Sequence, residues 1–249
     1  VCRDIAKYRA ALQYEFRMAD IPLYCDEPTT PEFSAPATAV RALLALARGA
    51  DLTENLTTLA KTGLCALREE EVCALENYAY TWSPNAAAWR AEFTKNPKGF
   101  GDAAPTEEDA ENLKRAEKAR ALLMGALETL RAKLRDANAE QMSRALYFCL
   151  KELGAEEQQA AQVEATRTAR GIPAAEEAAR EWNVVMGLLD EMARLLGTQT
   201  VTVPEYEDLF GLLLRSSDLG HIPQTLDAVV LASAGKMRLD APDYVFVLG

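Results

Sequence analysis

The segment Val1–Cys25 reads VCRDIAKYRAALQYEFRMADIPLYC and carries three structural patterns in succession. Val1-Cys2 is a short apolar run of the kind that forms buried strands. The apolar residues that follow recur with helical spacing and share one face of a predicted helix: Ile5, Tyr8, Leu12 and Phe16. Pro22 stops that helix from continuing, so Ile21–Cys25 is predicted to be extended. The segment therefore predicts an extended stretch, a helix and a second extended stretch.

The other end of the chain also contains strand patterns. Ala228–Ala232 and Tyr244–Leu248 are rich in apolar, β-branched and aromatic residues, and a basic loop separates them. We expect Val1-Cys2 and these two segments to share one small sheet that brings the chain ends together. A protein seldom begins and ends in core strands, because each would leave an unpaired edge. We therefore expect this chain to be a piece of a longer one.

Between the two ends, the apolar periodicity is almost wholly helical. Thr106–Asp109 resembles a helix-capping signal, and a leucine-rich stripe follows it as far as Leu134. A short strand is expected at Thr200–Val203. The predicted fold is mainly α, with a helical subdomain at residues 51–224. This subdomain is inserted between the strands of a small partial α/β sheet formed by residues 1–50 and 225–249.

The composition is that of an ordinary globular protein of 249 residues, 49% hydrophobic and 26% charged. The net charge of −11 argues against a broad basic groove for nucleic acid, although it leaves room for a local basic patch. No apolar run approaches the ~20 residues that span a membrane. Five cysteines without a C-x-x-C pair favour reduced thiols in a cytosolic protein.

The segment Lys61–Trp82, KTGLCALREEEVCALENYAYTW, contains residues that suggest several kinds of site. Lys61-Thr62-Gly63 has the letters of a phosphate loop in the wrong order, so it is interpreted as the end of a helix. Glu69–Glu71 is expected to begin the next helix, where the carboxylates favour the dipole and face water. Cys65 and Cys73 lack zinc-ligand spacing and are expected to pack as small apolar residues.

Two further groups of residues bear on chemistry. Lys236 and Arg238 lie on the loop between the last two predicted strands. Such a loop is usually only solvated, but a neighbouring sheet would hold it rigidly, and it is the best nucleic-acid contact candidate in the sequence. The single histidine, His221, is interpreted as a loop residue. Catalysis by a Cys–His or Ser–His pair would have to recruit that histidine, which disfavours it.

The two ends of the chain resemble the second motor domain of UvrD-like DNA helicases. In that domain a strand ending in arginine leads to a helix and an Ile-Pro-Tyr segment, and here VCRD precedes the helix and Ile21–Tyr24 follows it. The C-terminal VVLASAGKMRLDAPDYVFVLG resembles a later strand–loop–strand of the same domain. Active helicases carry a Lys-Gly-Leu-Glu type of signature on that loop. Lys236–Leu239 has neither the glycine nor the acid, which implies a degenerate motor.

A narrower resemblance lies in the interior of the chain. Lys61–Leu64 (KTGL) and Leu75–Tyr78 (LENY) resemble a run of the B subunit of AddAB-type helicase–nucleases. That resemblance implies a mostly helical, non-catalytic fragment that guides single-stranded DNA in double-strand-break repair and recombination. It implies contacts to DNA by Lys236, Arg238 and Arg3, and an A subunit as partner. It also implies a place in the bacterial cytoplasm, with no membrane contact.

The same resemblance implies that the cofactors of the parent complex lie outside this chain. ATP and magnesium would belong to the motor of the A subunit, and an iron–sulfur cluster would belong to a C-terminal nuclease domain. No catalytic, cofactor or metal residue is therefore assigned in this chain.

Two other interpretations stay open. A helical protein–protein interaction domain unrelated to DNA predicts an exposed apolar groove and no sheet at the ends. A free-standing small enzyme predicts an enclosed pocket with a cluster of perturbed pKa values.

Overall fold

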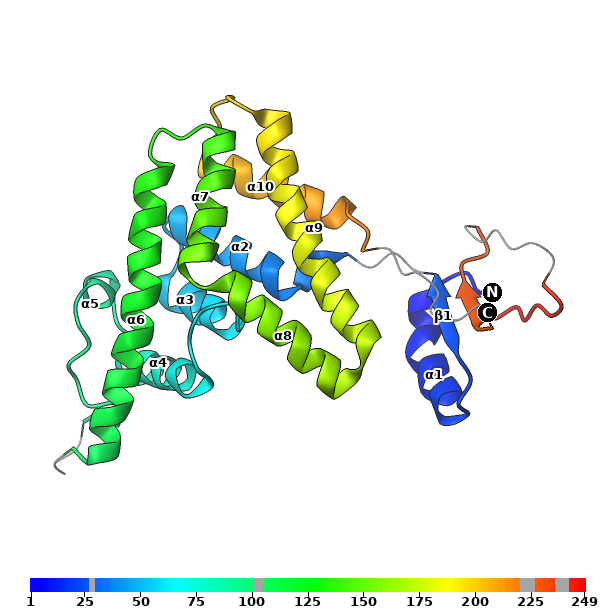
Figure 1. Ribbon diagram of the computed structural model, residues 1–249, viewed down its shortest axis with the longest axis horizontal. Coiled ribbons are helices and arrows are strands. Elements are labelled where there is room, and N and C mark those ends of the chain that lie inside the picture. The colour runs from blue at the N-terminus through cyan, green and yellow to red at the C-terminus, as the bar shows by residue number, and fades with distance from the viewer. Residues whose placement is uncertain (27–29, 101–104, 220–226, 236–241) are drawn as a thin grey trace. The chain divides into compact units, whose positions relative to one another are not determined.

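The computed structural model describes residues 1–26, 30–100, 105–219, 227–235 and 242–249. The chain divides into two compact units. Residues 1–30 and 218–249 form one, called the end unit below, and residues 31–217 form the other, called the helical unit. Figure 1 labels the main elements of each.

The end unit is a small parallel α/β arrangement. Strand β1 (Leu23–Asp26) pairs in parallel with β2 (Val229–Ala232), with Leu23 opposite Val229 and Asp26 opposite Ala232. Cys2 forms parallel bridges to Ser233 and to Leu248. Helix α1 (Ile5–Met18) connects Cys2 to β1. Cys2, α1 and β1 therefore form a β-α-β crossover in which the segment of β2 and Ser233 lies between Cys2 and β1. The predicted sheet near the chain ends is confirmed.

The core of the end unit is built from the predicted face of α1. Ile5 is buried together with Cys2 and Leu231, and Tyr8 and Leu12 pack against them. Asp4 begins the helix, because its carboxylate accepts a hydrogen bond from the Ala6 N–H at 3.1 Å. The helix is therefore fixed both by its cap and by its apolar face.

One strand prediction in the end unit is wrong. Tyr244–Val247 is exposed rather than buried, and only Leu248 of the predicted strand is bridged to Cys2. The Leu248 N–H donates to the Val1 carbonyl at 2.9 Å, and the Val1 amino group donates to the Phe246 carbonyl at 2.7 Å. The segment is thus held at its end by backbone hydrogen bonds, without a ladder that would bury its side chains.

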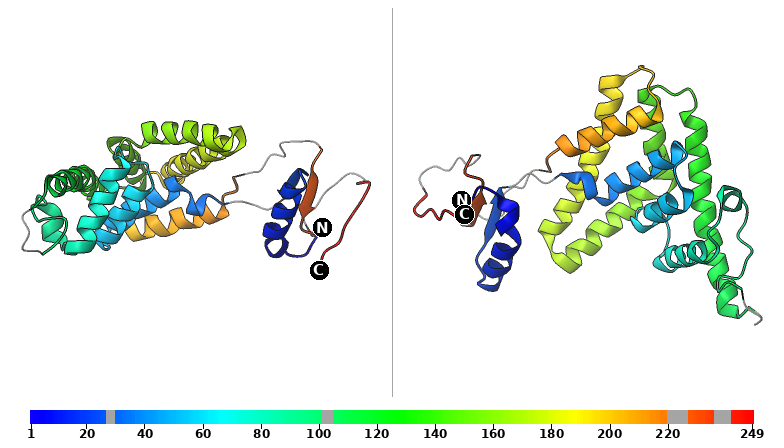
Figure 2. Two further views of the ribbon diagram at one scale, coloured as in Figure 1. Left: turned by 90° about the horizontal axis from the view of Figure 1, so that it is seen from below. Right: turned by 180° about the vertical axis from the view of Figure 1, so that it is seen from behind.

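The helical unit is a packed set of helices with one continuous apolar core. Its elements are η1 (Pro31–Phe33), α2 (Ala35–Ala47), α3 (Leu52–Lys61), α4 (Glu69–Trp82), α5 (Ala86–Arg90), α6 (Glu107–Leu134), α7 (Ala139–Glu152), α8 (Ala155–Arg170), α9 (Ile172–Leu196) and α10 (Val203–Ser216). The long helix α6 packs against α4 and α7, and α9 packs against α7 and α8 (Figures 1 and 2). The mainly helical fold class is confirmed.

Helix ends in this unit follow local sequence signals. Thr106 caps α6 as expected, and the carboxylate of Asp109 accepts a hydrogen bond from the Thr106 N–H at 2.8 Å. The predicted strand at Thr200–Val203 is wrong, because Val203 begins α10 and only Thr200 forms an isolated bridge, to Asn138. Thr202 caps α10 instead, through the N–H of Glu205.

The helical unit also holds its own two ends together. Element η1 packs against α10, and Glu32 lies 3.9 Å from Arg215 and 4.0 Å from Arg41. The two units meet at residues 30/31 and 217/218. Helix α2 belongs to the helical unit, because its Val40, Leu43 and Leu44 are buried in the core of that unit.

The segment that follows α3, residues 62–66, contacts helix α8 and the turn between α7 and α8. The Ala66 N–H donates to the Leu153 carbonyl at 2.7 Å, and Gln162 donates to the Thr62 carbonyl at 3.3 Å. Gly154 has φ +83°, and a Cβ placed there would lie 2.9 Å from the Ala66 Cβ. Only glycine suits both that conformation and that space. In the part of the chain that the structure describes, no helix is both long and apolar enough to cross a bilayer.

Candidate nucleic-acid interface

Of the three predicted DNA-contacting residues, the structure describes one. Arg3 is exposed and stands between Cys2, which is bridged into the sheet, and Asp4, which caps α1. Its backbone position is therefore fixed on both sides. Lys236 and Arg238 lie outside the described residues, and so does His221.

The described start of the basic loop is held next to the residue that precedes Arg3. The Cys2 N–H donates to the Ala232 carbonyl at 3.1 Å, and the Ala234 N–H donates to the Cys2 carbonyl at 3.0 Å. Ala234 stands two positions before Lys236 in the sequence. The sheet therefore brings the start of the loop and the start of α1 together at Cys2.

Neither unit carries a net positive charge. The end unit contains six Lys and Arg residues against nine Asp and Glu, and the helical unit contains 21 against 29. Phosphate binding by a broad basic face would need the opposite balance. Any contact to DNA by this chain must come from local groups of cations with neutral surroundings.

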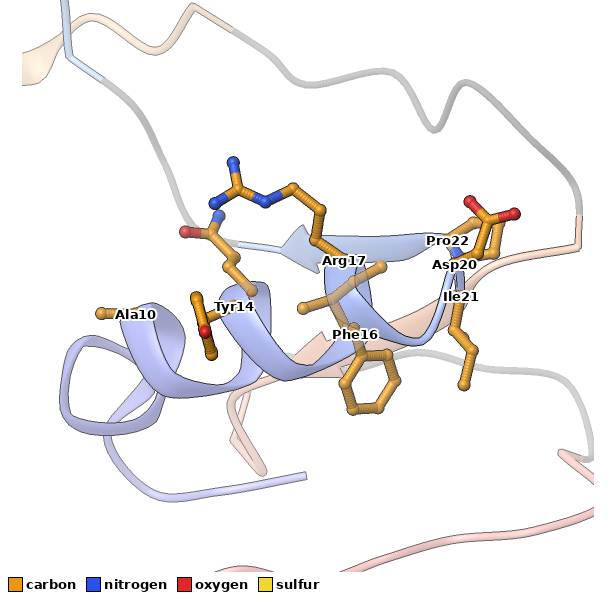
Figure 3. Close-up of a pocket in the computed structure, with 9 residues that line it drawn as sticks. Ala10, Tyr14, Phe16, Arg17, Asp20, Ile21 and Pro22 are labelled. Carbon is orange, nitrogen blue, oxygen red and sulfur yellow. The ribbon is translucent and has the colours of Figure 1, made fainter.

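A groove of about 710 Å³ lies along the outer face of α1 and the turn into β1 (Figure 3). Tyr14 and Arg17 line it from the helix, and Asp20 and Ile21 line it from the turn. Its one cation and one carboxylate balance each other, and the groove is open to solvent. Phe16, which the sequence analysis placed on the buried face of α1 with Ile5, lines this groove instead of packing in the core.

Glu71 does not face water as expected. Its side chain is buried, and its carboxylate accepts hydrogen bonds from the Arg68 N–H at 2.9 Å and from Lys118 Nζ at 2.7 Å. Burial alone would raise the pKa of this carboxyl, but Lys118 and Arg68 outweigh it and lower the pKa to about 2. Glu71 is therefore ionised at neutral pH and fixes the start of α4 against α6.

The other carboxyls with lowered pKa values are held in the same manner. The Thr106 N–H and hydroxyl, and then Lys98 at 3.0 Å, lower the pKa of Asp109, whose side chain is buried. For Glu117, burial raises the pKa, but hydrogen bonds from Arg120 and from the Phe93 N–H outweigh burial, so the pKa is lowered overall. These shifts result from helix caps and ion pairs. In contrast, burial and then Glu177 raise the pKa of Glu181 on α9.

The remaining residues of Lys61–Trp82 mostly have the expected structural roles. Lys61 ends α3 and pairs with Glu76, and Gly63 follows with φ +72°. Cys65 is buried, which raises the pKa of its thiol to about 12. Cys73 is exposed on α4, so the expectation that it packs is wrong. Among the described residues, no three His, Cys, Asp or Glu side chains are grouped in a way that could hold a metal ion.

These features define a mainly helical protein with a small parallel sheet near its chain ends. No known family model matches the chain. Several curated bacterial proteins are similar to it, all of them ATP-dependent helicase/deoxyribonuclease subunits B. The chain is 22% identical over 255 residues to the subunit from Clostridium acetobutylicum, and the match covers 100% of this chain and 22% of that protein.

Other relatives give the same result. The chain is 27% identical over 255 residues to the subunit from Moorella thermoacetica, with 99% of this chain and 22% of that protein covered. It is 25% identical over 258 residues to the subunit from Desulforamulus reducens, with 100% and 22% covered. The chain is thus distantly homologous over its whole length to these subunits and spans about 22% of their length.

Proposed function

We propose that this chain is a non-catalytic region of the B subunit of an ATP-dependent helicase/deoxyribonuclease, and that it guides single-stranded DNA in double-strand-break repair and recombination. The observation that carries the proposal is the full-length similarity to subunits B of that description. The β-α-β crossover of the end unit supports it, because a helicase-derived motor domain is built on a parallel sheet.

In this proposal the end unit is part of an inactivated second motor domain, and the helical unit is an accessory insertion between its strands. The A subunit of the same enzyme is the partner, and it supplies the motor that uses ATP and magnesium. An iron–sulfur cluster would belong to a nuclease region outside this chain. The complex would act in the bacterial cytoplasm.

The sheet near the chain ends also bears on the rival interpretations. A protein–protein interaction domain unrelated to DNA predicts no such sheet, whereas β1, β2, Cys2 and Leu248 form one. A free-standing enzyme predicts an enclosed pocket with perturbed pKa values, whereas the lowered pKa values of Glu71 and Asp109 come from ion pairs with lysines and from helix caps. The helicase-derived proposal accounts for both observations.

The test is the triple variant Arg3→Ala/Lys236→Ala/Arg238→Ala in the complete two-subunit enzyme. We expect weaker binding to single-stranded DNA and a shallower salt dependence, by about 0.7 in log–log slope for each lost phosphate contact. The matched control is Arg144→Ala/Arg167→Ala/Arg170→Ala. It removes the same charge from exposed helix positions of the helical unit. If DNA binding and unwinding match the control, the contact assignment is wrong.

A further inference from the structure

An exposed aromatic and basic surface lies at the end of α4, in the helical unit. It consists of Tyr80 and Trp82 from α4 and of Lys95, Lys98 and Phe100 from the segment that follows α5. The rings of Phe100 and Tyr80 are 93% and 89% exposed. Isolated exposed rings are common on protein surfaces. These rings differ because they are combined with lysines and with a rigid support, and the five residues are called the aromatic–lysine surface below.

The support comes from Trp82. Its indole Nε1–H donates to the Asn96 carbonyl at 2.8 Å, which ties the segment carrying the lysines to α4. Within that segment the Gly99 N–H donates to the same Asn96 carbonyl at 2.9 Å, and the Lys98 N–H donates to Asn96 Oδ1 at 3.0 Å. The backbone before Phe100 is therefore an ordered turn, which fixes the position from which the Phe100 side chain extends.

The rings and the cations are in contact. The Phe100 ring meets the Trp82 ring edge to face, with the centroids 4.6 Å apart. Lys95 Nζ lies over the Trp82 ring, 4.4 Å from its centroid. Because Lys95 covers Trp82, the free ring surface at this point belongs to Phe100. Tyr80 lies beside Pro97 and Lys98, with which it lines a cleft of about 570 Å³.

Thr94–Phe100 contains two lysines and no acid. Lys98 is paired with Asp109, and the exposed Glu107 and Glu108 precede Asp109 at the start of α6. Lys95 is therefore the cation of this surface that a phosphate would meet, beside the exposed rings. Glu69 and Glu70 line the same cleft as Tyr80 but start α4, about 15 Å along the helix from Tyr80. That distance exceeds the ~10 Å screening length at 0.1 M salt.

We propose that the aromatic–lysine surface binds single-stranded DNA, with a base stacked on Phe100, another on Tyr80, and a phosphate near Lys95. Exposed rings interleaved with cations are the usual means by which proteins hold single strands without reading their sequence. A duplex does not fit, because its bases are stacked on one another and are not free to stack on a side chain. This inference rests on the proposed function, and it adds a contact in the helical unit to the one proposed in the end unit.

The test uses the 249-residue chain and a fluorescently labelled oligo(dT) at low salt, followed by anisotropy. Phe100→Leu keeps an apolar side chain but removes the ring, and Phe100→Tyr keeps the ring. We expect Phe100→Leu to bind at least about fivefold more weakly, the lower end of the loss for one stacked base. Phe100→Tyr is expected to bind as the parent chain does. The matched control is Phe33→Leu, since Phe33 is 86% exposed elsewhere in the helical unit.

Each outcome decides the proposal. It is overturned if Phe100→Leu binds oligo(dT) as tightly as Phe33→Leu, or if the parent chain does not bind at all. Equal losses in Phe100→Leu and Phe100→Tyr would also overturn it, because a tyrosine ring should stack on a base as the phenylalanine ring does. If Phe100→Leu weakens binding but the Arg3/Lys236/Arg238 variant does not, the end-unit contact fails and the aromatic–lysine surface stands. If the Arg3/Lys236/Arg238 variant weakens binding but Phe100→Leu does not, the DNA contact proposed for the aromatic–lysine surface is wrong and the end-unit contact stands.

Discussion

Replacing Glu71 by glutamine tests how much a single buried carboxylate stabilises the helical unit. Glutamine is nearly the same size and still offers an oxygen to the Arg68 N–H, so the capping geometry at the start of α4 is retained. What the substitution removes is the negative charge between Lys118 and Arg68. The loss of stability in Glu71→Gln therefore reports on charge rather than on packing.

The magnitude follows from the pKa of Glu71, which is about 2 in the folded chain against an ordinary value of 4.5. That difference corresponds to about 3 kcal/mol of stability at neutral pH, at 1.36 kcal/mol per pKa unit. The figure is a ceiling, because the side chains of Lys118 and Arg68 are 62% and 67% exposed and water screens their charges. We expect Glu71→Gln to lower the free energy of unfolding by about 2 kcal/mol at pH 7.

The pH dependence supplies a second readout. A lowered pKa gives stability that is fully present above pH 4.5 and is lost as the pH falls toward 2. The difference between the parent chain and Glu71→Gln should therefore shrink over that window in urea denaturation followed by circular dichroism. Glu70→Gln, on the exposed side of the same helical turn, should change stability by less than about 0.5 kcal/mol. A Glu71→Gln effect that matches Glu70→Gln, or that stays constant from pH 7 to pH 3, would refute the reasoning.

Two further predictions concern glycines and cysteines. Gly154→Ala should cost about 1–3 kcal/mol, because its φ is +83° and the new Cβ would meet the Ala66 Cβ. Gly125→Ala, exposed within α6 with no atom within 4 Å of the new Cβ, should instead stabilise by about 0.5–1 kcal/mol, and opposite shifts in thermal midpoint would check the pair. In thiol labelling of the folded chain at pH 8, the exposed Cys73 should react first, while burial raises the pKa of Cys65 and Cys149 to about 12 and should leave both unreacted until the chain unfolds. Equal reaction rates for Cys73 and Cys65 would contradict the structure.

The successful sequence predictions rest on signals that act over a few residues. The spacing of Ile5, Tyr8 and Leu12 fixes which face of α1 is buried, whatever lies on the other side of that face. The Thr106–Asp109 capping box is likewise complete within four residues. The helices and their ends could therefore be predicted without knowledge of the tertiary fold.

The errors share the opposite property. Glu71 is buried and bonded to Lys118 of α6, 47 positions further along the chain, and its neighbours in sequence carry no sign of this contact. The Tyr244–Val247 run has the composition of a buried strand, yet burial of a strand requires a partner on each face, which composition does not specify. The aromatic–lysine surface was missed for the same reason, because the contact between Trp82 and Phe100 joins α4 to a distant segment.

The contact between η1 and α10 has a consequence for how the chain folds. Pairing β1 with β2 closes a loop of about 200 residues if the intervening chain is unfolded. Once Glu32 lies beside Arg215, only about 18 residues of that loop separate this pair from the two strands. The closure entropy then falls by about 2 kcal/mol, since it grows as (3/2)RT ln n. The helical unit is therefore expected to fold first. Its formation would then make the pairing of β1 with β2 easier, because it brings the two connecting segments close together.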